Sequence, residues 1–146
     1  MQVRDVMTRD PDVVQVGATL EEAARRMQMQ DVGALPVCDG PVLAGMLTDR
    51  DITVRATAMG LDPIQATAGQ VMTPAVAYCY EDQDVGEAAR LMGDQQVRRL
   101  VVVDRARRLV GIVSLGDLAM QAGDARLPGE VLERVSEPGG PEARHG

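Results

Sequence analysis

Hydrophobic residues recur at helical spacing in two segments of the chain. In each segment the apolar positions fall at i, i+3, i+4 and i+7, which places them on one face of an amphipathic helix. Thr19 stands directly before the first segment and Glu22 follows it by three residues, the spacing of a capping box at a helix N-terminus. We therefore predict two helices that bury the following faces: Leu20, Ala23, Ala24 and Met27 in the first, and Val85, Ala88, Ala89 and Met92 in the second.

Shorter apolar runs lie around these helices. They are rich in Val and Leu and are bounded by turn-forming residues such as Asp39-Gly40-Pro41, a pattern typical of buried strands. Further helices are expected to begin at Thr48 and Ser114, directly after two of the runs. Each half of the chain is therefore predicted to be strand, helix, strand, strand, helix, which is an α/β arrangement. The predicted strands cover residues 13–16, 35–38, 43–47, 76–80, 100–103 and 109–113.

The two halves are copies of one another. Val6-Met7-Thr8 returns 65 residues later as Val71-Met72-Thr73, and residues 5–39 match residues 70–104 at 13 of 35 positions. This tandem duplication indicates two structural repeats, and a unit of about 60 residues buries too little surface to be stable alone. We expect the repeats to pack sheet against sheet with pseudo-two-fold symmetry. The predicted division is repeat 1 at 1–58, a linker at 59–70, repeat 2 at 71–123, and a partly disordered C-terminal tail at 124–146.

Composition limits both the core and the chemistry. Hydrophobic residues make up 45% of the chain without any Phe or Trp, so nine Met, together with Val, Leu and Ala, must fill the core. All 15 cationic residues are Arg, and a formal net charge of −7 opposes binding to nucleic acid. The lack of Lys removes P-loop and Schiff-base chemistry, and His145 is the one histidine. We therefore expect no catalytic residues, no metal site and no nucleic-acid partner.

Cysteine content and hydropathy indicate the compartment. Cys38 and Cys79 are too few for a disulfide framework, and we expect both to be reduced residues of the core or its edge. No run approaches the roughly 18 apolar residues of a membrane span, and the N-terminus lacks the layout of a signal peptide. The sequence therefore predicts a cytoplasmic location and no membrane partner.

Two polar patterns suggest binding chemistry. Thr48 and Asp51, like Ser114 and Asp117, have the spacing of a capping box, so each pair either caps a helix or contacts a ligand. Arg98-Arg99 stands directly before a predicted strand. Its guanidinium groups either neutralise a phosphate or form ion pairs with Glu87 or Asp94 on the preceding helix. The spacing alone leaves both alternatives open.

These motifs, taken together, resemble a tandem CBS domain pair (cystathionine β-synthase-type domains), also called a Bateman module. The resemblance rests on the two Val-Met-Thr segments, on residues 32–37, and on the sequences GMLTDRD at 45–51 and GIVSLGD at 111–117. It covers roughly residues 3–122. Within that family the chain is similar to small stand-alone bacterial CBS-pair proteins, including the hypoxic-response type, through residues 33–38, 45–52 and 60–63.

The resemblance implies two clefts between the packed copies that hold adenosine-containing ligands. AMP, ADP, ATP, S-adenosylmethionine and NADH are the expected candidates, with Mg²⁺ alongside ATP, and no cofactor is required. In each cleft the carboxylate of the last motif takes the ribose hydroxyls and the Thr or Ser three residues earlier faces the phosphate. By the family pattern the first cleft uses Thr8, Val13, Val14, Val32, Gly33, Arg99, Ile112, Ser114 and Asp117, and the second uses Met46, Thr48, Asp51, Thr73, Val76, Val97 and Arg98.

The expected function is therefore that of a regulatory module. It would form a homodimer through its helices, bind an adenosine ligand and act on a separate, unidentified protein. Asp10 and Asp12 lie beside Thr8 and would repel a phosphate, and Val101 stands where the first repeat has Pro36. These departures keep open an alternative, a ligand-free dimeric interaction or scaffold protein. A weaker alternative is a thiol redox sensor through Cys38 and Cys79.

Overall fold

The computed structural model describes residues 1–74 and 76–122 and divides into two compact units. Asp12–Val76 form one, which we call the first-repeat unit. The other, the second-repeat unit, combines Met1–Pro11 with the chain from Ala77 onward. Each unit is a small sheet with helices on it, so the predicted α/β class is confirmed. The predicted tail at 124–146 lies outside the described residues.

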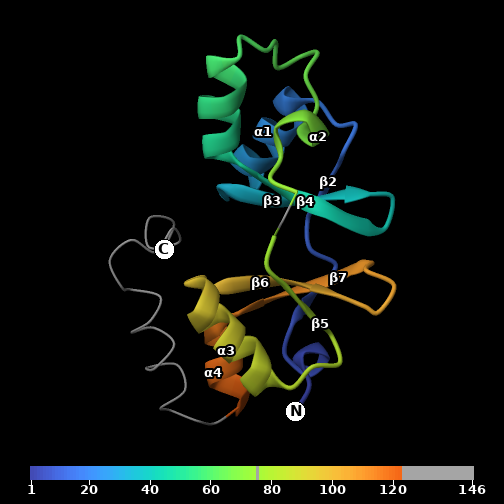
Figure 1. The fold of residues 1–146 in the computed structure, drawn as a ribbon, viewed down its shortest axis with the longest axis vertical. Helices are drawn as coiled ribbons and strands as arrows, with labels where there is room; N and C mark the ends of the chain where they lie inside the picture. Colours follow the sequence, from blue (N-terminus) through green and yellow to red (C-terminus); the bar gives the residue numbers. More distant parts are fainter. Residues whose placement is uncertain (75, 123–146) are drawn as a thin grey trace. The chain divides into compact units, whose positions relative to one another are not determined.

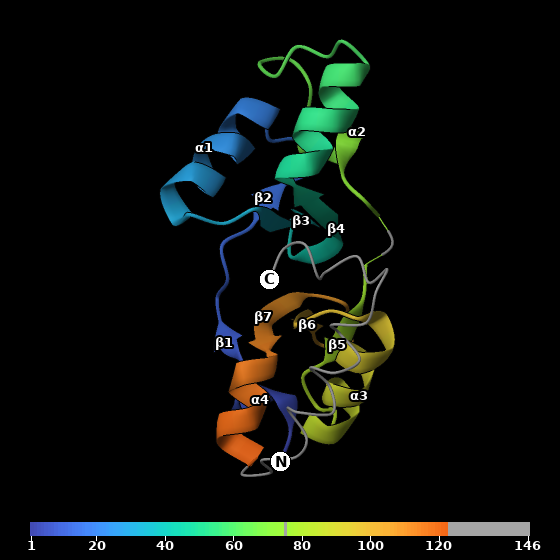
Figure 2. The same ribbon diagram turned by 90° about the vertical axis from the view of Figure 1, so that its left-hand side faces the viewer.

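The first-repeat unit is a three-stranded sheet covered on one face by helices. β2 pairs parallel with β3, and β3 pairs antiparallel with β4. α1 and the helix over residues 49–58 lie on the same side of this sheet (Figure 2). That helix has π-helical winding over its central stretch, η2. The elements are β2 (Val14–Gln15), α1 (Leu20–Gln30), β3 (Ala34–Asp39), β4 (Val42–Thr48), η2 (Asp51–Ala56) and α2 (Ala68–Val71).

The second-repeat unit is a four-stranded sheet in the order β1-β7-β6-β5. β5 pairs parallel with β6, β6 pairs antiparallel with β7, and the N-terminal β1 adds an antiparallel edge strand to β7. α3 and α4 lie together on one face of the sheet (Figure 1). Its elements are η1 (Val3–Asp5), β1 (Thr8–Arg9), β5 (Tyr78–Tyr80), α3 (Val85–Gln95), β6 (Arg99–Val103), β7 (Leu109–Ser114) and α4 (Leu115–Ala122).

The cores follow the predicted apolar faces with one exception. Thr19 caps α1, and its Oγ1 accepts the backbone N–H of Glu22 at 3.1 Å. In α3 all four predicted residues are buried. In α1 the exception is Ala24, which is exposed although it was predicted to be buried. The buried stripe of α1 is the narrower i, i+3, i+7 set, and Ala24 lies at its edge.

Candidate functional site

Both predicted capping boxes form where a strand passes into a helix. At the end of β4, the N–H of Thr48 donates to Asp51 Oδ2 and the N–H of Asp51 donates to Thr48 Oγ1, each at 3.0 Å. At the end of β7, Ser114 N–H donates to Asp117 Oδ2 at 2.9 Å and Asp117 N–H donates to Ser114 Oγ at 3.1 Å. The capping interpretation of this spacing is therefore confirmed in both units. Each box fixes a hydroxyl and a carboxylate side by side.

The second carboxylate oxygen differs between the two boxes. Asp51 is 9% exposed, and its Oδ1 lies 3.8 Å from Arg55 Nε. Asp117 is partly exposed, and no donor from residues 1–74 and 76–120 contacts its Oδ1. A carboxylate oxygen with no partner can accept hydroxyl groups from a ligand, and such charge-assisted hydrogen bonds are strong.

The two Val-Met-Thr segments lie beside these boxes. Thr8 on β1 pairs with Ile112 on β7, two residues before Ser114. In the first-repeat unit, Thr73 and Met46 exchange backbone hydrogen bonds of 3.0 and 2.8 Å. The threonine of each Val-Met-Thr segment therefore lies next to the strand that ends in the box.

A glycine on each strand permits this close approach. A Cβ at Gly111 would lie 2.7 Å from the carbonyl oxygen of Thr8, and one at Gly45 would lie 2.5 Å from that of Thr73. Real Cβ atoms do not come so close to backbone oxygens, so the two glycines are required for the segments to dock.

The cationic surroundings of the two hydroxyl groups also differ. Arg99 is the Cα partner of Ser114 across β6 and β7, so both side chains stand on the same face of the sheet. At the equivalent position, Ala34 is the Cα partner of Thr48. Arg98 and Arg99 are exposed and form no ion pair with any carboxylate of residues 1–74 and 76–122. Glu87 instead accepts a hydrogen bond from Gln83 Nε2 at 3.0 Å.

The structure divides the predicted ligand residues between the two units. The second-repeat unit brings together Ser114, Asp117 and Thr8. The first-repeat unit brings together Thr48, Asp51 and Thr73. Val32 and Val97 are partly buried and pack against the core of their own unit. The second-repeat unit contains Thr8, Val97, Arg98, Arg99, Ile112, Ser114 and Asp117. The first-repeat unit contains Val13, Val14, Val32, Gly33, Met46, Thr48, Asp51, Thr73 and Val76.

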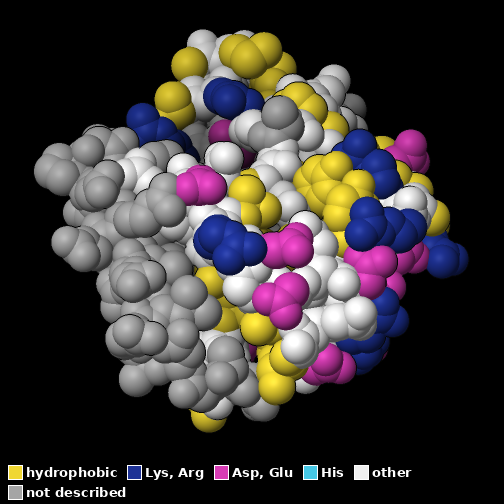
Figure 3. Space-filling view, turned by 60° about the horizontal axis from the view of Figure 1, so that its bottom comes forward, with side chains coloured by type: hydrophobic (Ala, Val, Ile, Leu, Met, Phe, Trp, Pro, Cys, Tyr) yellow, Lys and Arg dark blue, Asp and Glu magenta, His cyan; other side chains and the backbone are white. Residues whose placement is uncertain are grey.

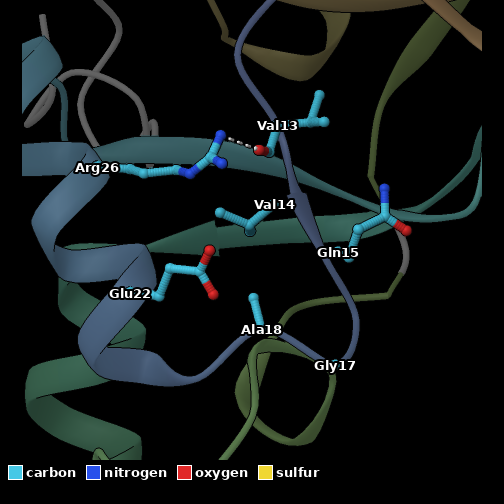
Figure 4. Close-up of a pocket in the computed structure, with 7 residues that line it drawn as sticks. All are labelled: Val13, Val14, Gln15, Gly17, Ala18, Glu22 and Arg26. Carbon is cyan, nitrogen blue, oxygen red and sulfur yellow. Dashed lines mark hydrogen bonds between the residues drawn. The ribbon is translucent and has the colours of Figure 1, made fainter.

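A pocket of about 450 Å³ opens beside Val13 and Val14 in the first-repeat unit (Figure 4). This volume is in the range of small-molecule sites. Arg26 extends from α1 across it, and its Nη1 donates to the carbonyl of Val13 at 3.0 Å. The two valines belong to the residues expected from the family pattern, whereas no sequence pattern predicted that Glu22 and Arg26, at i, i+4 on α1, line a pocket with them. The lining residues are Val13, Val14, Gln15, Gly17, Ala18, Glu22 and Arg26.

Both cysteines are buried and free. Burial raises the pKa of the Cys79 thiol to about 12, and it also raises the pKa of Cys38. A thiol is reactive as its thiolate, so neither side chain is activated near neutral pH. The burial and the raised pKa values weigh against the thiol redox alternative.

Three further observations concern alternative functions. No helix in the described ranges is long and apolar enough to cross a membrane. Among residues 1–74 and 76–122, no group of three or more His, Cys, Asp or Glu side chains could hold a metal ion. Arg and acidic side chains are interspersed on the face shown in Figure 3. On that face the mixed charge does not provide the single-sign field that attracts a nucleic acid.

Known proteins are similar to this chain over most of its length. The CBS domain family matches residues 3–56 and 68–122. The CBS domain-containing protein YhcV of Bacillus subtilis is 41% identical over 134 residues, which is 92% of this chain and 94% of the relative. Hypoxic response protein 1 of Mycobacterium tuberculosis is 43% identical over 117 residues, covering 80% and 81% of the two chains.

Solved structures share the fold. Hypoxic Response Protein I, determined with two coordinated zinc ions, is 41% identical at a TM-score of 0.72, covering 83% of this chain and 98% of that one. CBSX2 in complex with AMP is 26% identical at a TM-score of 0.70, covering 86% and 98%. The CBS pair of MJ0100 with 5′-methylthioadenosine and S-adenosylmethionine is 29% identical at a TM-score of 0.66, covering 84% of this chain and 96% of that one. With both repeats matched and relatives this similar, the chain belongs to the CBS domain family, as a tandem pair.

Proposed function

We propose that this CBS pair is a regulatory module that binds an adenosine-containing ligand and acts through a separate protein. The observation that carries the proposal is the pairing of a carboxylate and a hydroxyl at the start of a helix in each unit, beside a Val-Met-Thr threonine. Support comes from two similar CBS-pair structures, one solved with AMP and one with methylthioadenosine and S-adenosylmethionine.

In the second-repeat unit, the proposed roles follow from the chemistry of each group. Asp117 Oδ1 accepts the ribose hydroxyls, and Ser114 faces the phosphate, which the neighbouring Arg99 neutralises. Thr8 and Ile112, adjacent across β1 and β7, flank the adenine. The Asp117 carboxylate and the Arg99 guanidinium fit a nucleotide that carries at least one phosphate.

In the first-repeat unit, the same roles are proposed for a second set of residues. Asp51 takes the ribose, Thr48 faces the phosphate end, and Met46 with Thr73 flanks the base. The remaining residues expected from the family pattern are proposed as further ligand contacts: Val13, Val14, Val32, Gly33, Val76, Val97 and Arg98.

We also propose that the protein is a homodimer assembled through its helices. Met29 on α1 is 80% exposed and Met120 on α4 is 83% exposed, so each helix presents a large apolar side chain to solvent. Unbranched, polarizable Met side chains suit a helix contact of this kind. Sedimentation at several protein concentrations gives the oligomeric state directly.

Thermal unfolding in the presence of candidate ligands tests the proposed function. The panel is AMP, ADP, ATP, S-adenosylmethionine and NADH, each at millimolar concentration, with and without Mg²⁺. A ligand present at 100 times its Kd adds about 2.7 kcal/mol of stability, which raises Tm by several degrees. The shift should disappear in the double variant Asp51→Asn with Asp117→Asn. It should persist in Asp39→Asn, which changes an exposed carboxylate at the end of β3.

A ligand-free scaffold is the second candidate, and the position of Asp10 favours it. Asp10 is exposed, has a φ of 52°, and lies two residues after Thr8. Its carboxylate would repel a phosphate that approaches Thr8. The scaffold function predicts no thermal shift with any compound of the panel, together with a stable dimer.

A further inference from the structure

The carboxylate of Asp51 already has a cationic partner within its own unit. Its Oδ2 accepts the Thr48 N–H at 3.0 Å, and its Oδ1 lies 3.8 Å from Arg55 Nε, one turn further along the helix. The side chain of Asp51 is 12% exposed, whereas that of Arg55 is 50% exposed. The guanidinium can therefore move into solvent, while the carboxylate stays in place.

The same guanidinium holds the chain that leads to Thr73. Arg55 Nη1 donates to the carbonyl of Val71 at 3.1 Å and to that of Met72 at 3.4 Å. The next residue, Thr73, is fixed to Met46 by two backbone hydrogen bonds. Arg55 thus connects the carboxylate proposed to take the ribose with the segment proposed to flank the base.

The second repeat has no cation at the equivalent position. Thr48 and Asp51 correspond to Ser114 and Asp117 at an offset of 66 residues, and the same offset places Gln121 where the first repeat has Arg55. Among residues 1–74 and 76–120, no donor contacts Asp117 Oδ1. One carboxylate therefore has an ion-pair partner one turn further along its helix, whereas the residue at that position for the other is the uncharged Gln121.

We infer that Arg55 competes with the ligand for Asp51, so that the Asp117 site fills first and the Asp51 site fills at higher ligand concentration. The inference rests on the proposed function and adds an order of occupancy to it. A ribose that takes Asp51 Oδ1 displaces Arg55, and the carbonyls of Val71 and Met72 then lose their donor. Binding at the Asp51 site therefore changes the hydrogen bonds that hold residues 71–73. The two sites then have different regulatory consequences.

Calorimetric titration in single-site backgrounds tests this order. The probe is 5′-methylthioadenosine, which carries ribose hydroxyls but no phosphate, so Arg55 cannot attract it by charge. Asp117→Asn isolates the Asp51 site. In that background Arg55→Gln should tighten binding by up to about fivefold, or about 1 kcal/mol, the upper range for a solvent-exposed ion pair. The matched control is Arg25→Gln, which removes an exposed i, i+4 ion pair with Glu21 on α1 and should leave the Kd unchanged.

Three results separate the inference from the function on which it rests. If Arg55→Gln binds methylthioadenosine with unchanged or weaker affinity, Arg55 does not compete with the ligand and the inference is overturned. The proposed function is still supported in that case, because methylthioadenosine binds. Weaker binding of AMP in Arg55→Gln would make Arg55 a phosphate contact and would also overturn the competition. If neither compound binds the wild type nor any variant, the proposed function fails and the inference fails with it. Circular dichroism and Tm of each variant establish that it is folded.

Discussion

Gly111 and Thr8 approach each other so closely that no side chain fits between them. A Cβ at Gly111 would lie 2.7 Å from the carbonyl oxygen of Thr8 and 2.7 Å from the sulfur of Met7. This contact joins the first residues of the chain to the sheet of the second repeat. It places Thr8 two positions from the box formed by Ser114 and Asp117, and the proposed site depends on it.

Gly111→Ala should therefore weaken the pairing of β1 with β7. Overpacking of this kind costs about 1–3 kcal/mol of the free energy of unfolding, because backbone atoms must move. Urea denaturation measures the loss. Gly17→Ala is the control, since a Cβ there meets nothing within 4 Å, and it should change stability by less than about 0.5 kcal/mol. Equal effects of the two substitutions would show that the close approach is not required.

Ser114→Ala should destabilise α4 through loss of the cap. The hydroxyl accepts the Asp117 N–H at 3.1 Å, and removing such a cap costs about 0.5–2 kcal/mol. Asp117→Asn keeps an oxygen acceptor for the Ser114 N–H and should cost less. Denaturation midpoints of the two variants rank the effects. A Ser114→Ala protein as stable as the wild type would contradict the box.

Met92→Ala should cost about 2–5 kcal/mol, because this side chain is fully buried in the core of the second-repeat unit. Met29→Ala is the matched substitution at a position that is 80% exposed. For the protomer alone it should change stability by less than about 0.5 kcal/mol. A larger loss that depends on protein concentration would place Met29 in the proposed dimer interface. Similar, concentration-independent losses for both would contradict the assignment of Met92 to the core.

The Cys79 thiol should make stability fall at alkaline pH. Burial raises its pKa to about 12 in the folded chain, whereas an unfolded cysteine titrates near 8.5. Between these values the unfolded chain has lost the proton and the folded chain retains it, so raising the pH favours unfolding. The stabilisation is complete below about pH 8.5 and should be reduced by about 1–2 kcal/mol at pH 10.

Urea midpoints at pH 8 and pH 10, compared between wild type and Cys79→Ala, isolate this contribution. The variant should lose less stability than the wild type between the two pH values. Iodoacetamide at pH 8 should label neither cysteine until urea unfolds the chain. Rapid labelling of the folded protein would instead restore the thiol-sensor alternative.

Much of the fold follows from local patterns. Thr19, Glu22 and the apolar spacing behind them determine α1, because capping and amphipathicity act within a few residues. Ala24 was placed in the core wrongly, because a small residue at the edge of the stripe satisfies the pattern whether it is buried or exposed. The capping boxes at Thr48 and Ser114 were also predictable from spacing.

Contacts between distant segments were not predictable from periodicity. The pairing of Thr8 with Ile112 joins residues more than a hundred positions apart. The family resemblance placed the two residues in one cleft but did not predict that their strands pair. Arg55 reaches the carbonyls of Val71 and Met72 across a turn and a short helix, and no local pattern marks that contact. The difference between Asp51 and Asp117 depends instead on the i, i+4 pair of Asp51 with Arg55. The sequence shows that spacing and the Gln121 at the equivalent position, and the structure shows that the two side chains of the first pair meet.

The most direct test of the account follows the backbone amides of the labelled protein by NMR while AMP is added. The proposed function predicts saturable shifts that are largest at Thr8 and over residues 111–117, with changes near Thr48 and Asp51 at higher AMP concentration. Asp117→Asn should abolish the first set. Absence of any shift up to millimolar AMP, or saturable shifts confined to residues outside both boxes, would contradict the account.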